Sequence, residues 1–165
     1  MNGSVVDEDL YRDVIGGFLT GVTVVTASDA GHDHGMALSA ITSVSLDPPM
    51  LLVCVNRTAR TSRAIRSGGG FGVNILAADQ EDLARRFAAR RSDKFDGLAV
   101  DRDNPLGVPV LPGVLGWLAC RVVDQHDAGT HTIFVAEVVA ASGRSVEPLA
   151  YFRGGFGRPG ERTAA

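Results

Sequence analysis

Short runs of apolar and β-branched residues, separated by turn-forming residues, recur along most of the chain. Side chains alternate across a strand, so a period of two, or a short apolar run between turn residues, predicts extended structure. The segment 29–35, DAGHDHG, has the composition of a turn between the first two strands. The segments that we expect to be extended are 21–27, 36–46, 50–56, 71–76, 116–127, 131–142 and 148–152.

Three further segments have the spacing of apolar residues that is typical of helices: 7–19, 57–69 and 79–91. The last is the clearest, because Asp79 is a good N-cap, acidic residues open the segment and arginines close it. We expect Gly68–Gly70 to end the second helix, since glycine adopts the left-handed conformation that often terminates helices.

These elements predict a mainly β (α+β) fold rather than a doubly wound parallel sheet. Segments 116–127 and 131–142 flank a short turn and should form a hairpin, which favours an antiparallel barrel with a few short helices. No internal repeat or linker divides the chain, so we expect one domain over residues 10–156. Residues 1–9 and the Gly/Pro/Arg-rich tail 157–165 are expected to be flexible.

Composition and charge argue against several functional classes. The net charge of −3 gives no general attraction for nucleic acid, and no apolar run approaches the roughly 20 residues of a membrane-spanning helix. The cysteines, Cys54 and Cys120, lie in apolar runs without the spacing of a disulfide framework or a zinc site. The start, MNGSVVDEDL, is unlike a signal peptide. We therefore expect a reduced, cytoplasmic protein without nucleic-acid or membrane partners.

Hydroxyl and arginine side chains concentrate on two neighbouring segments in the first half of the chain. A strand that leads into a helix N-terminus presents free N–H groups, and hydroxyls with arginines would complete a site for a phosphate-bearing ligand. The same residues are also ordinary strand and capping residues with solvated arginines, and spacing alone does not decide between these alternatives. They are Ser39, Thr42, Ser43 and Ser45 on the first segment, and Asn56, Arg57, Thr58, Arg60, Thr61, Ser62 and Arg63 on the second.

Small apolar side chains accompany these hydroxyls. Ala37, Ala40, Val53 and Val55 are suited to line a flat aromatic ligand, because small side chains let a planar ring approach the backbone. This pattern is suggestive of a ligand site but is not specific to one.

The histidines and short motifs narrow the chemistry further. The pair His32-x-His34 has no additional ligands at metal spacing, so we expect no metal site. His131 follows a Gly-containing turn, where it either faces the mouth of a pocket or lies on the surface. Neither G-x-S-x-G, a Walker P-loop nor a G-x-G-x-x-G after a strand occurs, so any nucleotide binds without a Rossmann fingerprint.

The order of these segments resembles the flavin reductase-like family, which has the FMN-binding split-barrel fold, over about residues 10–156. The stretch SVSLDPP, followed by an apolar strand that ends in Asn, is quite specific, and the chain is most similar to reductase components of two-component flavin monooxygenases. The matching segments are FLTGVTVVTA (18–27), HGMALSAITSVSLDPPMLLVCVNRTARTS (34–62), FGVNIL (71–76), DLARRFA (82–88), DKFDG (93–97), GTHTIFVAEV (129–138) and LAYFRGGF (149–156).

The resemblance implies roles for residues at the matching positions. His131 would stand where the nicotinamide arrives and is the implied catalytic residue. The implied cofactor-binding residues are Ser39, Ala40 and Thr42 at the isoalloxazine and ribityl chain, Asp47 and Pro48 at the rim, Cys54, Val55 and Asn56 along the ring, Thr61 and Ser62 at the phosphate, Phe87, Arg90 and Lys94 on the phosphate side or at the tail of a dinucleotide flavin, and Phe152 and Phe156 closing the pocket of the same or the neighbouring subunit.

Two positions depart from the family pattern. Thr130 precedes His131 where the family often has Asp, so the acidic neighbour that would orient or charge the histidine is missing. Ser39 stands where Asn is often seen, which is expected to loosen contact with the flavin.

By resemblance, the chain is an NAD(P)H:flavin oxidoreductase. It would transfer a hydride from NADH or NADPH to FMN or FAD and release reduced flavin to a separate monooxygenase, and it would form a homodimer with flavin near the interface. The cofactors carry this chemistry, so no general base is required. Two alternatives stay open: a flavin- or haem-binding split-barrel carrier or sensor without reductase activity, and a structural dimeric barrel that has lost its ligand.

Overall fold

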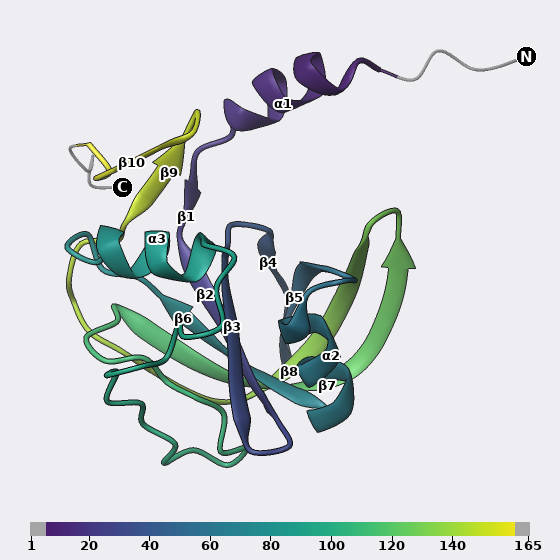
Figure 1. Ribbon diagram of the computed structural model, residues 1–165, viewed down its shortest axis with the longest axis vertical. Coiled ribbons are helices and arrows are strands. Elements are labelled where there is room, and N and C mark those ends of the chain that lie inside the picture. Colours follow the sequence, from purple (N-terminus) through teal and green to yellow (C-terminus); the bar gives the residue numbers. More distant parts are fainter. Residues whose placement is uncertain (1–5, 161–165) are drawn as a thin grey trace, which may run out of the picture.

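The computed structural model describes residues 6–160. Its centre is a seven-stranded sheet with the order β3-β2-β6-β7-β8-β5-β4, in which every neighbouring pair is antiparallel (Figure 1). The strands are β2 (Thr23–Asp29), β3 (His32–Leu38), β4 (Ile41–Leu46), β5 (Pro49–Asn56), β6 (Gly70–Ile75), β7 (Gly116–Ala128) and β8 (His131–Gly143).

The two edge strands of this sheet are consecutive in the sequence. β3 ends at Leu38 and β4 begins at Ile41, so only Ser39 and Ala40 connect opposite edges of the sheet. Two residues span at most about 7 Å, which forces the sheet to curve until its edges meet. The result is the split barrel that the sequence predicts.

Three helices and a small second sheet complete the fold. Helix α2 (Arg60–Gly68) packs across β2 and β3, α3 (Glu81–Ala88) lies against β3, and α1 (Glu8–Gly16) stands away from the barrel (Figure 1). The second sheet has the order β1-β9-β10. Its strands are β1 (Thr20–Gly21), β9 (Ala150–Phe152) and β10 (Gly155–Gly157). No helix within residues 6–160 is both long and apolar enough to cross a membrane.

Two apolar clusters form the core on the two faces of β2. The first joins the inward residues of β5, β6 and β8 to the buried face of α2, and it includes Cys120, whose thiol pKa burial raises to about 12. The second lies beneath α3 and includes Phe87. β2 can serve both clusters because five consecutive residues, Thr23 to Ala27, are buried, as in a strand covered on both faces.

A buried amide fastens the long connection between α3 and β7 to the sheet. Asn74 is fully buried, and its Nδ2 donates to the carbonyl of Val24 (3.1 Å) and to Thr26 Oγ1 (3.2 Å). Its Oδ1 accepts from the N–H of Leu111 (2.8 Å). Thr26 Oγ1 donates in turn to the carbonyl of Pro109 (2.5 Å). Both groups are therefore satisfied, as burial requires.

The predicted strands and helices are all present, with differences at their boundaries. The segment 29–35 is wrong as a turn, because β3 already begins at His32 and pairs with β2 down to Asp29. The segment 36–46, predicted as one strand, is two: β3 ends at Leu38, β4 begins at Ile41, and Ser39 and Ala40 between them close the barrel. Asp79 does not cap α3: Gln80 occupies that position without a side-chain cap, and its amide bonds the Ala77 N–H and the Pro112 carbonyl instead.

The expected flexibility of segments 1–9 and 157–165 stays a prediction, although parts of both have regular structure. Asp7 caps α1 by accepting from two N–H groups, so residues 8 and 9 are helical. β10 ends at Gly157, and Arg158 forms an ion pair with Glu147 (3.3 Å). Residues 1–5 and 161–165 lie outside the described part of the chain.

Candidate active site

The link that closes the barrel lies beside the end of β5. The N–H of Cys54 donates to the carbonyl of Ala40 (3.0 Å), and Thr42 pairs with Leu52 one step further along β4. Ser39, Ala40 and Thr42 are all exposed. Barrel closure therefore brings the predicted residues of the two segments together.

Alternate side chains of β5 face the core and the candidate site. Val55 is fully buried in the first cluster, whereas Cys54 and Asn56 are half-buried on the opposite face. Only the backbone of Val55 can therefore reach a ligand there. Asn56 Oδ1 accepts from the N–H (2.9 Å) and the hydroxyl (2.8 Å) of Thr58, which turns the strand into α2.

The first turn of α2 begins without a side-chain cap. Ala59 provides no side-chain cap, so the N–H groups that open the helix have no partner from the cap residue. Thr61 and Ser62 are buried, and Ser62 Oγ has no hydrogen-bond partner within the described chain. A buried polar group normally has a partner. These residues therefore fit the phosphate of a flavin, which would satisfy both the hydroxyl and the helix terminus.

His131 lies at the same end of the barrel as α2's first turn. Its partner across the β5–β8 pair is Asn56, and the N–H of Arg57 donates to the Thr130 carbonyl (3.0 Å). His131 is exposed, and its Nδ1 is 2.9 Å from Thr130 Oγ1. The Thr130 hydroxyl is thus within hydrogen-bond distance of Nδ1 of the imidazole. It stands in place of the acidic neighbour that the family resemblance led us to look for.

A charged network beside His131 was not predicted from the sequence. Asp127 Oδ1 accepts from Arg66 Nη2 (2.7 Å) and from Thr132 Oγ1 (2.7 Å), and its second oxygen is 3.9 Å from Arg57. Hydrogen bonds from Thr132 and Arg66 hold the pKa of Asp127 below its ordinary value. The network ties α2 to the β7–β8 hairpin, and only the pairing of Asp127 with Thr132 across that hairpin could have indicated it.

The predicted cofactor-binding residues on and after α3 lie in different surroundings. Phe87 is fully buried, with its ring edge-on to Phe95 at 5.0 Å, so its side chain has no free surface for a cofactor. Lys94 Nζ donates to the carbonyls of Gly35 (3.2 Å) and Phe87 (2.8 Å), and burial lowers the pKa of its ammonium group. Arg90 is exposed. Lys94 therefore fastens the segment after α3 to the barrel edge.

The remaining predicted residues lie apart from this cluster. Asp47 and Pro48 form the turn between β4 and β5, about 20 Å from Cys54 at ~3.3 Å per strand residue. Phe152 and Phe156 belong to the small sheet, where Phe152 is exposed and Phe156 lies under the guanidinium of Arg85 (5.1 Å). Contact of these four residues with a flavin stays a prediction.

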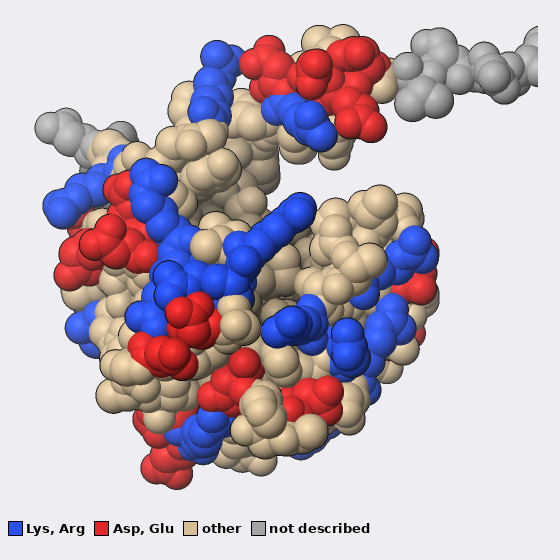
Figure 2. Space-filling model, viewed as in Figure 1, with Lys and Arg blue, Asp and Glu red and all other residues tan. Residues whose placement is uncertain are grey.

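Basic side chains surround a cavity on the outer flank of α2. Figure 2 shows Lys and Arg side chains gathered on this face, around β3 and towards α2 and α3. The cavity has a volume of about 390 Å³ and is lined by Asp29, His34, Arg60 and Arg63. The sequence left open whether these arginines bind an anion or are solvated. It did not indicate Asp29 and His34, because segment 29–35 was expected to be a turn.

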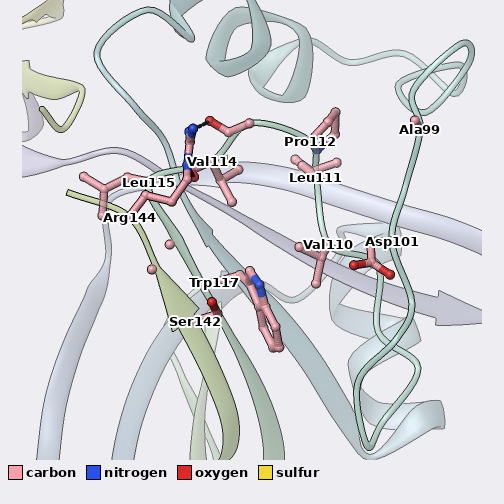
Figure 3. A pocket seen from close by; sticks show the side chains of 13 residues that line it. Ala99, Asp101, Val110, Leu111, Pro112, Val114, Leu115, Trp117, Ser142 and Arg144 are labelled. Atoms are coloured by element: carbon pink, nitrogen blue, oxygen red, sulfur yellow. Dashed lines mark hydrogen bonds between the residues drawn. The ribbon is translucent and has the colours of Figure 1, made fainter. Parts of the chain in front are cut away.

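A second cavity, of about 270 Å³, lies at the opposite end of the β7–β8 hairpin from His131 (Figure 3). Trp117, Ser142 and Asp101 line it, and Arg144 at its edge bonds the carbonyls of Gly113 and Val114. None of the predicted site residues contributes to this cavity. Within residues 6–160, no three His, Cys, Asp or Glu side chains are grouped to hold a metal ion.

Comparison with known proteins gives consistent matches along the chain. The model of the flavin reductase like domain matches residues 15–160. The reductase component of 4-nitrophenol 4-monooxygenase/4-nitrocatechol 2-monooxygenase from Rhodococcus opacus is 46% identical over 92% of this chain and 81% of its own length. The flavin reductase (NADH) of Kitasatospora aureofaciens is 41% identical over 98% of this chain and 88% of its own length.

Solved structures agree with the fold. Nitrilotriacetate monooxygenase component B from Mycobacterium thermoresistibile has a TM-score of 0.91 at 35% identity, covering 97% of this chain and 92% of its own. The NADH:FAD oxidoreductase SgcE6 of Streptomyces globisporus, in complex with NAD and FAD fragments, has a TM-score of 0.85 at 34% identity, covering 98% of both chains. These likenesses confirm the predicted mainly β split barrel and support the predicted reductase activity with flavin and NADH. The chain belongs to the flavin reductase-like domain family.

Proposed function

We propose that this chain is the reductase component of a two-component flavin-dependent monooxygenase. It takes a hydride from NADH onto FMN or FAD and releases the reduced flavin to the oxygenase. The observation that carries the proposal is the uncapped first turn of α2, with its buried, unpartnered Ser62 hydroxyl, which follows closely on Asn56, the residue paired with His131. The names of the relatives, which are reductase components and NADH-dependent flavin reductases, support the same activity.

The residues of the chain have a binding and orienting task. When both molecules are bound, the nicotinamide supplies the hydride and the flavin accepts it, so the bond changes are those of the cofactors. The first turn of α2 holds the flavin phosphate, and the outward face of β5 with Ser39 and Ala40 supports the ring. Holding two rings at reacting distance supplies much of the rate enhancement. A carrier or sensor would use the same flavin contacts, but the relatives' names favour the reductase.

His131 orients the nicotinamide in this proposal. Its contact with Thr130 Oγ1 fixes the ring and leaves Nε2 free to meet the substrate. A hydroxyl brings no charge, so the histidine is held by a neutral hydrogen bond. The missing acidic neighbour therefore changes the electrostatics of this position more than its geometry.

The proposal includes a homodimer whose protomers exchange contacts through α1. No residue of α1 is buried, although the helix and the segment after it carry a row of large apolar side chains. A surface of this kind is typical of an interaction site, and a second copy offers a symmetric way to cover it. The exposed fractions are 57% for Leu10, 68% for Val14, 51% for Ile15, 72% for Phe18 and 57% for Leu19.

A cytoplasmic location is the last part of the proposal. Cys54 and Cys120 are both free in the structure, which is consistent with the reduced state predicted from the sequence. NADH as the electron donor points to the same compartment.

The purified protein should oxidise NADH only when FMN or FAD is added, because the chain itself holds no group that accepts a hydride. The measurement is a steady-state absorbance assay that crosses both flavins with NADH and NADPH. Absence of turnover in all four combinations would contradict the proposed activity, and flavin binding without turnover would favour the carrier.

Ser62→Ala should weaken FMN binding roughly tenfold, as expected for loss of one hydrogen bond to a charged group. Riboflavin, which lacks the phosphate, should bind the variant and the wild type equally, and fluorescence titration measures both. The free energy of unfolding should not fall, because the hydroxyl has no partner in the free protein. Ser145→Ala, in an exposed loop, is the control. Equal losses for FMN and riboflavin would place Ser62 away from the phosphate.

His131→Ala should raise the KM for NADH on the order of tenfold, the cost of about one hydrogen bond, while the flavin Kd stays within twofold. Steady-state kinetics and flavin titration separate the two effects. His126→Ala is the matched control, since His126 is exposed on the same hairpin and contacts Asp124. An unchanged KM in the His131 variant would remove the histidine from the nicotinamide site.

Val14→Glu should shift the protein from dimer towards monomer, because it places a charge in the apolar row of α1. Sedimentation velocity at several protein concentrations measures the distribution. Asp13→Asn, on the same helix, should leave the dimer intact. A wild-type protein that sediments as a monomer at every concentration would refute the dimer.

A further inference from the structure

The cavity on the outer flank of α2 is separate from the residues proposed to hold the flavin phosphate. Arg60 and Arg63 line it from the helix, and Asp29 and His34 line it from β2 and β3. Its volume of about 390 Å³ lies within the range of roughly 300–1,000 Å³ that is usual for ligand pockets.

Helical spacing explains why both arginines reach this cavity. Residues three and four apart share a helix face, so Arg60, Arg63 and Ser67 lie on one flank of α2. Ser67 Oγ donates to Asp29 (3.0 Å), which joins that flank to the end of β2. Thr61 and Ser62 point inward and are buried.

The two arginines have no ion-pair or hydrogen-bond partner in the part of the chain that the structure describes. Within residues 6–160, the other arginines except Arg90 contact a carboxylate, a backbone carbonyl or an aromatic ring. Those with such contacts are Arg12, Arg57, Arg66, Arg85, Arg86, Arg91, Arg102, Arg121, Arg144, Arg153 and Arg158. Two unpaired guanidinium groups on one cavity form a site suited to a phosphate or another anion.

The other charged groups around the cavity do not neutralise the positive charge of Arg60 and Arg63. Asp29 is the one carboxylate in the lining, and it already accepts the Ser67 hydrogen bond. Asp33, on the same hairpin, is paired with Arg102. Burial lowers the pKa of His34; Asp29 opposes this effect and Arg60 adds to it, so the imidazole adds little positive charge that would compete for Asp29.

The position of the cavity indicates which anion it takes. Arg60 and Arg63 flank Thr61 and Ser62 within one helical turn, which rises about 5.4 Å. A ligand whose first phosphate lies at the start of α2 would therefore carry a directly linked second phosphate towards the arginines. Arg66, in contrast, leaves the helix towards Asp127 and Thr132 on the side of His131.

We propose that this cavity is a subsite for the second phosphate and the adenosine of FAD, so that the chain binds FAD in preference to FMN. The proposal rests on the proposed function and assigns its flavin. NADH and NADPH also carry an adenosine on linked phosphates. The nicotinamide, however, is proposed to meet His131, whose neighbour Thr132 is bonded by Arg66 and not by the cavity-lining Arg60 or Arg63, which favours the flavin tail as the occupant.

The test compares the Kd of FAD and FMN, by titration calorimetry, for the wild type, Arg60→Ala/Arg63→Ala and the control Arg121→Ala, which removes a half-exposed arginine on β7. We expect wild-type FAD to bind at least about tenfold more tightly than FMN. The double variant should lose roughly tenfold or more in FAD affinity and less than twofold in FMN affinity. Arg63→Gln alone should lose part of the FAD preference.

Each other outcome overturns the proposal in a different way. Equal losses for FAD and FMN would assign the arginines to the first phosphate. A raised KM for NADH or NADPH, measured with FMN as acceptor and accompanied by an unchanged FAD-to-FMN ratio, would assign the cavity to the nicotinamide dinucleotide. A wild type that binds both flavins equally would refute the subsite alone, whereas failure to bind either flavin would refute the proposed function as well.

Discussion

Closure of the barrel through two residues is the constraint on which the rest of the structure depends. Because Ser39 and Ala40 join opposite edges of the sheet, β4 must lie close to β3 while it pairs with β5. That arrangement sets the exposed link beside the end of β5, where the chain turns at Asn56 into α2. A longer connection would allow a flatter sheet and would separate Ser39 and Ala40 from the end of β5 and from α2.

The fold could be predicted from the sequence because its strands are marked by strong local patterns. The β-branched runs and the apolar strand before Asn56 specify their own conformation. The break between β3 and β4, within the predicted strand 36–46, has no such pattern, since Ser39 and Ala40 suit a strand as well as a bend. The turn assigned to 29–35 was wrong for a related reason. Asp, His and Gly favour turns locally, but pairing with β2 extends His32–Gly35 into an edge strand.

The site was predictable only in part, because its residues act through three-dimensional contacts. Asn56 and His131 lie opposite each other because β5 pairs with β8, which the sequence suggested through its strands. The apolar spacing on α3 is consistent with the core position of Phe87, whereas the cofactor contact implied by resemblance is not. The Asp127 network and the cavity lined by Arg60 and Arg63 each combine elements distant in sequence, so no local sequence motif predicts them.

The burial of Cys120 has a consequence for how the protein withstands its own chemistry. Reduced flavin that meets oxygen before it reaches an oxygenase generates peroxide, and thiols are attacked as thiolates where solvent can reach them. Cys120 is fully buried and its thiol pKa is raised to about 12, so it stays protonated and shielded. Cys54 is half-buried beside Ala40 and is the accessible thiol. Cys54 is therefore the thiol that an oxidant can reach, whereas the thiol in the core of the barrel is shielded.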